Sequence, residues 1–175
     1  VYSEMAKQQA PTPQLDNILT RIEENAGDMI QSMSDIVWMI NPKYDNFTYV
    51  IQRMENFASG FLSLKDIQYT LTKESGIEEL KLDMEKRKNI FLIFKEALHN
   101  AAKHAGCRKV DIHLNVSGRM LDMIIADDGT GFEPAHQQNG NGLDNMAKRA
   151  EEVGGQFKLD SRAGEGTTIQ VIIPV

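Results

Sequence analysis

Hydrophobic and polar positions repeat with a helical period over the first third of the chain. After the break at Pro11-Thr12-Pro13, apolar residues recur at alternating intervals of four and three, which is a heptad repeat. A helix with such a seam needs a partner helix to cover it. We therefore expect a two-helix hairpin that dimerises into a bundle, with a single helix packed on the main domain as the alternative. The seam consists of Leu15, Leu19, Ile22, Ala26, Met29, Met33, Ile36 and Ile40.

This helix is expected to end at Asn41-Pro42, because proline lacks an amide donor and disfavours helical geometry at the preceding residue. A second helix should follow, capped by Asp45 or Asn46. One face of it is apolar and carries Phe47, Val50, Met54, Phe57 and Phe61. The chain is accordingly divided into a partial dimerisation region, residues 1–44, and a main domain, residues 45–175.

The other two thirds of the chain mix strand and helix patterns. Alternating apolar residues predict strands near residues 67–71, 110–116, 121–127, 157–161 and 168–173. A helical period predicts helices over 83–104 and 143–153. Since the strands cluster in hairpins with helices between them, we expect an α+β fold: a two-layer α/β sandwich with a mixed sheet and helices on one face.

Composition excludes several classes of function. The 19 lysines and arginines against 25 aspartates and glutamates give a net charge of −6, which argues against a general nucleic-acid binder. A lone cysteine, Cys107, cannot form an internal disulfide and favours a reducing compartment. No apolar run approaches the roughly 20 residues of a membrane helix. Because the chain begins with Val1 in a helical pattern, we interpret it as a fragment of a longer protein.

Polar residues interrupt the apolar face of the helix predicted over 83–104. Glu96, Asn100, Lys103 and His104 fall within about 100° of arc and form one stripe beside the core. Such a stripe is most simply a solvated face. However, asparagine is a poor helix former that gains nothing in water, whereas its carbonyl, one turn from a carboxylate, can coordinate a hard cation such as Mg²⁺.

A carboxylate stands at a buried position where a strand ends. Odd-numbered residues of 121–127 point inward, which places Asp127 on the buried side. Burying a carboxylate is costly unless a group pairs with it. Asp127 is therefore either a cap for the following turn, Asp128-Gly129-Thr130-Gly131, or the floor of a pocket that accepts a hydrogen bond from a ligand's amino group.

A glycine-rich segment, Gly140-Asn141-Gly142-Leu143, comes directly before a helix. Free amides at a helix N-terminus bind phosphate, and glycines let phosphate oxygens approach them. An ordinary loop has the same composition, so this motif alone does not decide between the two interpretations.

Four motifs nevertheless follow one another in a set order. They are ExxxN (Glu96 to Asn100), DxGxG (Asp127 to Gly131), GxGL (Gly140 to Leu143) and GxGT (Gly164 to Thr167). Together they resemble the Bergerat-type ATP-binding fold shared by histidine kinases, Hsp90-like chaperones, gyrase B subunits and mismatch-repair ATPases. The resemblance covers about residues 67–175. The Lys103-His104 ending of the asparagine helix and the helix before Pro42 resemble sensor histidine kinases with a short dimerisation domain.

The resemblance implies an ATP-binding role for residues in these motifs. Asp127 would accept from the adenine amino group, with Thr167 or Thr168 holding a nearby water. Asn100 would ligate a Mg²⁺ ion that bridges the phosphates, with Lys103 and His104 beside them. Glu96 would be the base, or the carboxylate that orients the acceptor imidazole, and residues 132–141 would form a lid. The other ATP-binding positions implied are Gly129, Gly131, Gly140, Gly142, Leu143 and Gly166.

The implied reaction is phosphoryl transfer from ATP to a histidine and then to an aspartate of a response regulator receiver domain. The resemblance also implies a homodimer held by the N-terminal helices and a cytoplasmic location, with a parent that can be anchored in the bacterial inner membrane. Neither nucleic acid nor membrane is expected to contact this region. The acceptor histidine belongs upstream of Val1, so self-phosphorylation is not expected. The alternatives are an ATP hydrolase in which Glu96 activates water, and a non-catalytic nucleotide-binding or dimerisation module.

Overall fold

The computed structural model describes residues 46–133 and 141–175, together with isolated positions between residues 18 and 41. The chain divides into two compact units, Val1–Asn41 and Pro42–Val175. The described positions from 18 to 38 are helical. Four residues of the predicted seam are described: Ile22, Ala26 and Met33 are exposed, and Leu19 is half-buried. Ile18 and Val37, which are not seam residues, are also exposed. The other seam residues lie outside the described residues, so the dimer stays a prediction.

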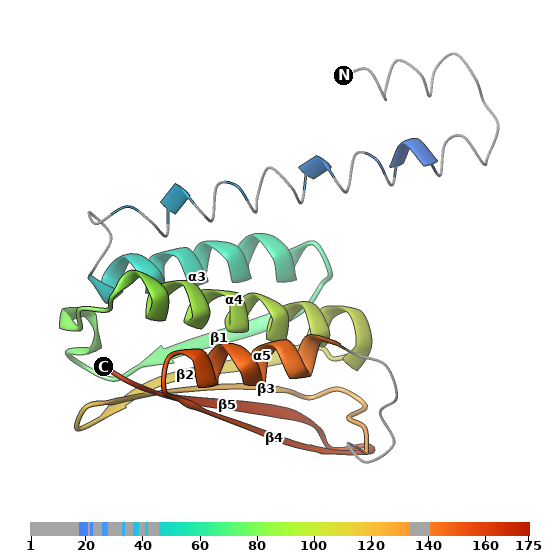
Figure 1. The fold of residues 1–175 in the computed structure, drawn as a ribbon. Coiled ribbons are helices and arrows are strands. Elements are labelled where there is room, and N and C mark those ends of the chain that lie inside the picture. Colours follow the sequence, from blue (N-terminus) through green and yellow to red (C-terminus); the bar gives the residue numbers. More distant parts are fainter. Residues whose placement is uncertain are drawn as a thin grey trace. The chain divides into compact units, whose positions relative to one another are not determined.

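The second unit is built on one five-stranded sheet with the strand order β1-β2-β3-β5-β4. Strand β1 (Gln68–Lys73) pairs parallel with β2 (Lys109–Ser117). All other pairs are antiparallel and join β2 to β3 (Met120–Asp127), β3 to β5 (Gly166–Pro174) and β5 to β4 (Gln156–Arg162). Figure 1 shows the helices α3 (Phe47–Ser63), α4 (Met84–Asn100) and α5 (Asn141–Glu152) on the same face of this sheet. The predicted α+β sandwich is confirmed.

Two helices begin at polar caps, one of which was predicted as a cap. Asn46 caps α3 by accepting a hydrogen bond from the Thr48 amide at 2.9 Å, which decides between the two predicted caps. Asp83 caps α4 by accepting from the Lys86 amide at 2.8 Å. Such caps satisfy amides that have no partner within the helix. Two details were not predicted: a short 3₁₀ helix, η2 (Ile77–Glu79), and a π-helical turn, η3 (Ala101–Ala105), which continues α4.

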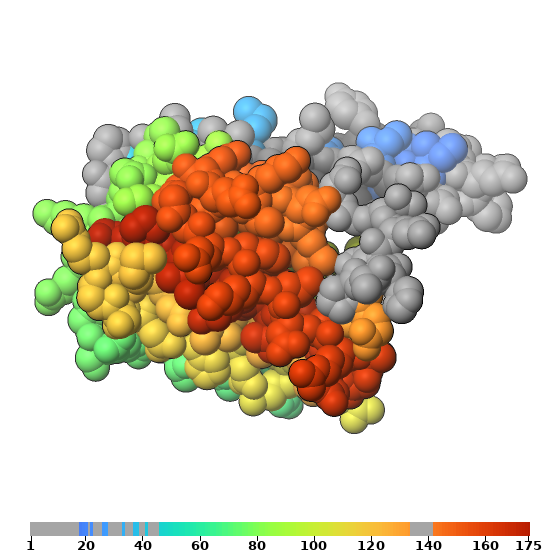
Figure 2. Space-filling model, turned by 60° about the horizontal axis from the view of Figure 1, so that its bottom comes forward, coloured from blue at the N-terminus to red at the C-terminus, as the bar shows by residue number. Residues whose placement is uncertain are grey.

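The core lies between the helices and the inner face of the sheet. Nine inward-facing strand residues are at most 4% exposed, and they alternate with half-buried or exposed neighbours as the period of two requires. Burying one such side chain contributes about 1.5–3 kcal/mol. These nine are Val110, Ile112, Leu114, Leu121, Met123, Ile125, Ile169, Val171 and Ile173. In the space-filling view, α5 and the two C-terminal strands form one continuous surface with the β2–β3 hairpin (Figure 2).

The outer face of the sheet is polar. Gln170 of β5 donates to both carboxylate oxygens of Asp122 on β3, at 2.9 and 3.0 Å. His113 on this face is half-buried, and its Nδ1 lies 2.6 Å from Thr72 Oγ1 on β1. Across the described ranges, no helix is both long and apolar enough to cross a membrane.

Candidate functional site

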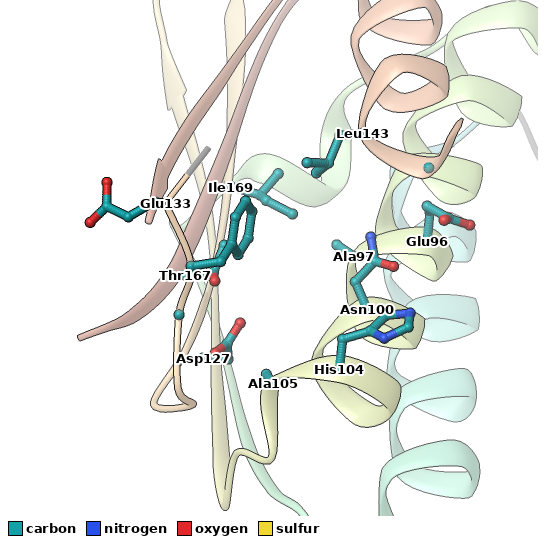
Figure 3. Close-up of a pocket in the computed structure, with 13 residues that line it drawn as sticks. Glu96, Ala97, Asn100, His104, Ala105, Asp127, Glu133, Leu143, Thr167 and Ile169 are labelled. Carbon is teal, nitrogen blue, oxygen red and sulfur yellow. The ribbon is translucent and has the colours of Figure 1, made fainter. Parts of the chain in front are cut away.

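A cavity of about 500 Å³ opens between the helices and the C-terminal part of the sheet. Its walls come from α4 and η3 on one side, from β3 and β5 on the other, and from the start of α5 (Figure 3). Eight of the predicted site residues line it: Glu96, Asn100, His104, Asp127, Gly131, Gly142, Leu143 and Thr167. Two further lining residues, Phe132 and Glu133, belong to the segment predicted as a lid, and three were not predicted: Ala97, Ala105 and Ile169.

Asp127 and Asn100 lie on opposite sides of this cavity. Figure 3 shows the Asp127 carboxylate at the end of β3, facing the Asn100 amide on α4, while the carboxylates of Glu96 and Glu133 point away from the centre. A carboxylate accepts hydrogen bonds, and an amide oxygen can coordinate a hard cation. The two sides therefore offer different chemistry, an acceptor at one end and a cation ligand at the other.

Asp127 is held in place by backbone amides. Its Oδ1 accepts from the Gly129 amide at 2.9 Å. Burial raises the pKa of Asp127 above its ordinary value, and the amides of Gly129 and Thr167 offset only part of that effect. A half-buried carboxylate whose desolvation is only partly offset by hydrogen bonds is typical of a ligand-binding site.

The neighbouring Asp128 makes its side-chain hydrogen bonds to a different segment. Its Oδ1 accepts from the amides of Arg108 and Lys109 at 2.8 and 2.9 Å. These two hydrogen bonds, that of Lys109 first, lower the pKa of Asp128. They join the end of β3 to the start of β2. Asp127 fills both roles left open for it, because its Oδ1 caps the turn through the Gly129 amide and its carboxylate also faces the cavity. The exposed Asp128 is not among the residues that line the cavity.

Three glycines of the motifs are required by contacts between backbones. A Cβ at Gly129 would overlap the carbonyl of Ala105 on η3, and the adjacent Thr130 amide donates to the same oxygen at 2.8 Å. Gly131 has φ +57° and faces the Arg162 carbonyl. Gly166 has φ +80° and faces the Asp127 carbonyl. L side chains rarely adopt such φ values. These glycines therefore let η3, β3 and β5 meet at the rim of the cavity.

Gly142 allows a different close contact, between α5 and α4. A Cβ there would overlap the Glu96 carboxylate and lie 3.6 Å from Asn100 Nδ2. The first turn of α5 thus lies directly against the ExxxN motif, although the two are more than forty residues apart. The first amides of a helix have no partner within it and favour an anion.

Other predicted residues lie elsewhere. Lys103 is exposed on η3 and does not line the cavity. Thr168 pairs with Ala126 and Asp160 on the outer face of the sheet, because side chains alternate along β5 and Thr167 points inward. Gly129 and Gly166 support the rim without lining the cavity. Gly140 and most of the expected lid lie outside the described residues.

Among the missed residues, Ile169 had a signal in the sequence. It follows Thr167 by two positions and therefore shares its face of β5. Phe132 was predicted only as the first residue of the lid, and nothing in its spacing predicts that it lines the cavity. Ala105 lines the cavity at the end of η3, one residue beyond the predicted helix.

Cys107 is buried near Asp127 and Asp128 and is expected to react slowly. Its thiol donates to the Ala101 carbonyl at 3.5 Å. Burial, together with the charges of Asp127 and Asp128, raises the pKa of the thiol from 9.0 to about 11. At pH 8 the reactive thiolate is then about a hundredfold scarcer than for an ordinary thiol. Iodoacetamide labelling followed by mass spectrometry should be at least that much slower in the native protein than in urea; equal rates would contradict this environment.

A mixed sheet with helices on one face, and an acid facing an amide across a cavity, define a nucleotide-binding α/β domain. The comparisons with known proteins agree. Residues 85–175 match the family described as histidine kinase-, DNA gyrase B- and HSP90-like ATPase. The chain therefore belongs to this family and carries its ATP-binding domain.

Its relatives are named as kinases. A sensor-like histidine kinase of Chloroflexus aurantiacus is 33% identical over 108 residues, which are 58% of this chain and 18% of that protein. The sensor histidine kinase LiaS of Bacillus subtilis is 32% identical over 111 residues, which are 63% of this chain and 28% of that protein. The matched part thus covers less than a third of either relative.

Solved structures share the fold. The histidine kinase AdeS of Acinetobacter baumannii superposes with a TM-score of 0.66 at 15% identity, covering 94% of this chain and 86% of that chain. The histidine kinase domain of a blue-light activated kinase from Erythrobacter litoralis gives 0.61 at 18% identity, covering 90% of this chain and 83% of that chain.

Proposed function

We propose that this chain is the catalytic region of a two-component sensor histidine kinase, which transfers the γ-phosphoryl group of ATP to a histidine and then to a response regulator. The observation that carries the proposal is the cavity with Asp127 facing Asn100. Its volume suits a small-molecule ligand. The named relatives support a partnership with response regulators in general terms.

The residues at the Asp127 end fit a purine base. The Asp127 carboxylate offers an acceptor, as an exocyclic amino group requires, and Ile169 supplies an apolar wall beside Thr167. In this proposal Asp127 orients the base. ATP, when bound, supplies the phosphoryl group.

The residues at the Asn100 end fit phosphates with Mg²⁺. Asn100 provides one oxygen ligand, and within the described ranges no cluster of three or more acidic, histidine or cysteine side chains could hold a metal alone. Mg²⁺ commonly binds in this way, with few protein ligands and the rest from phosphates and water. His104 on η3 and the first amides of α5 lie at the same end. We propose that they neutralise and orient the phosphates, with Lys103 available nearby.

Glu96 is proposed as the base, or the carboxylate that orients the acceptor imidazole. Its carboxylate lies against Gly142, at the edge of the cavity and away from Asp127. This position leaves room for a second reactant to approach from outside. Phosphoryl transfer depends mainly on such positioning and on charge neutralisation.

We further propose that residues 1–44 belong to a homodimeric helical region and residues 45–175 to the catalytic domain, working in the cytoplasm. Within the described ranges, the histidines do not fit the acceptor. His99 packs against Phe61 with the rings tilted by 53° and their centroids 4.6 Å apart. His104 lines the cavity, and His113 lies on the outer sheet face. We propose that the acceptor lies upstream of Val1, as the resemblance to sensor histidine kinases implies.

Radiolabelled ATP tests the proposal. A longer version of the protein that includes the upstream helix should acquire acid-labile, alkali-stable label on histidine. Glu96→Gln should slow labelling by about 10²–10⁴-fold, the usual contribution of a positioned base, with ATP affinity nearly unchanged. Steady phosphate release without label would instead show a hydrolase, and ATP binding with neither outcome would show a non-catalytic module.

A further inference from the structure

Ser161 of β4 joins three segments around the cavity. It is 6% exposed, one of three buried polar residues in the described part of the chain. Its Oγ lies 2.9 Å from the Phe132 amide nitrogen, 3.1 Å from the Gly166 carbonyl oxygen and 3.0 Å from Thr167 Oγ1. No sequence motif includes this residue. Its three contacts reach the segment after the DxGxG motif and the first two residues of β5.

The direction of each hydrogen bond follows from chemistry. A serine hydroxyl has one hydrogen to donate and two lone pairs that accept. The Phe132 amide can only donate, and the Gly166 carbonyl can only accept. Ser161 therefore accepts from Phe132 and donates its single hydrogen to Gly166. In the remaining contact the Thr167 hydroxyl must therefore donate to Ser161. The single hydrogen and both lone pairs of the Ser161 hydroxyl are then engaged.

This arrangement determines what Thr167 presents to the cavity. Thr167 lines the cavity, and its only hydroxyl hydrogen is directed at Ser161. Only the lone pairs of its oxygen remain for a ligand. Asp127 is the strand partner of Thr167 in the β3–β5 ladder, and its carboxylate also accepts. Two acceptors thus stand side by side at one end of the cavity, and a ligand group there must donate.

We propose that Ser161 is a positioning residue that holds the Thr167 hydroxyl as an acceptor and so makes the cavity select a 6-amino purine over a 6-oxo purine. The inference rests on the proposed nucleotide-binding function and adds a specificity device to it. A 6-oxo group would place a third acceptor against Asp127 and Thr167. Leaving polar groups unpaired in this way is a strong source of discrimination.

The test compares ATP with inosine triphosphate, which has a 6-oxo group and no 2-amino group. Isothermal titration calorimetry measures both dissociation constants. The wild-type protein should prefer ATP. In Ser161→Ala the Thr167 hydroxyl can turn its hydrogen toward the ligand, so the preference should fall by about five- to tenfold, the equivalent of one hydrogen bond. A purely structural loss would weaken both nucleotides equally and leave the ratio unchanged.

Two variants of Thr167 keep the test valid if Ser161→Ala fails to fold. Thr167→Val removes the acceptor without disturbing the bonds of Ser161 to Phe132 and Gly166, and it should lower the preference. Thr167→Ser restores a hydroxyl and should restore the preference. In the double variant with Thr167→Val, Ser161→Ala should lower the preference no further. Ser117→Ala, at an exposed serine at the end of β2, is the matched control.

The outcomes separate this inference from the proposed function. An unchanged preference in Ser161→Ala, or in Thr167→Val where only that variant folds, overturns the role of Ser161 and leaves ATP binding intact. Equal affinity of the wild-type protein for both nucleotides overturns it as well. Failure of the wild-type protein to bind either nucleotide contradicts the proposed function and the inference together.

Discussion

Asparagine in place of Asp127 is expected to weaken ATP binding by about 1–3 kcal/mol, the usual effect of leaving a buried polar group mismatched. The amide presents a donor where the carboxylate accepted, so one hydrogen bond to an amino group is reversed. Calorimetric titration with ATP measures the effect. Asp128→Asn is the matched control, because Asp128 is exposed, is not among the residues lining the cavity, and its one bonded oxygen remains able to accept from Arg108 and Lys109. Equal losses in both variants would remove Asp127 from the site.

The same substitution should not destabilise the nucleotide-free protein at neutral pH. Burial raises the pKa of Asp127 in the folded state. A raised pKa means that the folded form holds the proton more tightly than the unfolded form does. The protonated Asp127 carboxyl therefore contributes to the stability of the fold at low pH, and this contribution is lost as the pH rises through the folded pKa. At pH 7 the ionised carboxylate is therefore a cost that asparagine removes. The melting temperature of Asp127→Asn should equal or exceed that of the wild type at pH 7, and this advantage should shrink toward pH 4.

Gly166→Ala is expected to reduce the free energy of unfolding by at least about 3 kcal/mol, through overpacking and a strained φ together. Gly166 has φ +80°, and a Cβ there would overlap the Asp127 carbonyl, which belongs to backbone and cannot move aside. Urea unfolding followed by circular dichroism measures the loss.

Gly164→Ala is the matched control for that experiment. Gly164 has φ +87°, in the same turn, but nothing lies within 4 Å of its added Cβ. The free energy of unfolding of Gly164→Ala should fall only by the cost of an L residue in the left-handed conformation, about 1–2 kcal/mol. If the free energy of unfolding fell equally in both variants, the close approach of β5 to the end of β3 would not be what requires glycine at position 166.

Much of the fold could be predicted because local periodicity reports which side of an element is buried. The alternation in 121–127 placed Leu121, Met123 and Ile125 inward, and all three are buried. The same pattern placed Asp127 toward the helices. The caps Asn46 and Asp83 follow from the residue types that satisfy free amides.

Less of the site could be predicted, because its parts meet through contacts distant in the sequence. Asp128 was recognised as part of a turn, but its bonds to Arg108 and Lys109 depend on where β2 begins. Thr167 and Thr168 are equivalent in the sequence until the register of β3 against β5 turns only Thr167 inward. Ser161 belongs to no motif, since its importance comes from three neighbours on other segments.

By itself, the amino-acid sequence determined which residues face the core, where the helices begin and which motifs carry polar chemistry, because these depend on period, propensity and capping over a few residues. Only the tertiary structure decided which of those residues face one another. The opposition of Asp127 and Asn100, the contact of Gly142 with Glu96 and the hydrogen bonds of Ser161 require α4, α5 and three strands to pack in one register. That register is set by close backbone approaches at glycines, which no local pattern encodes.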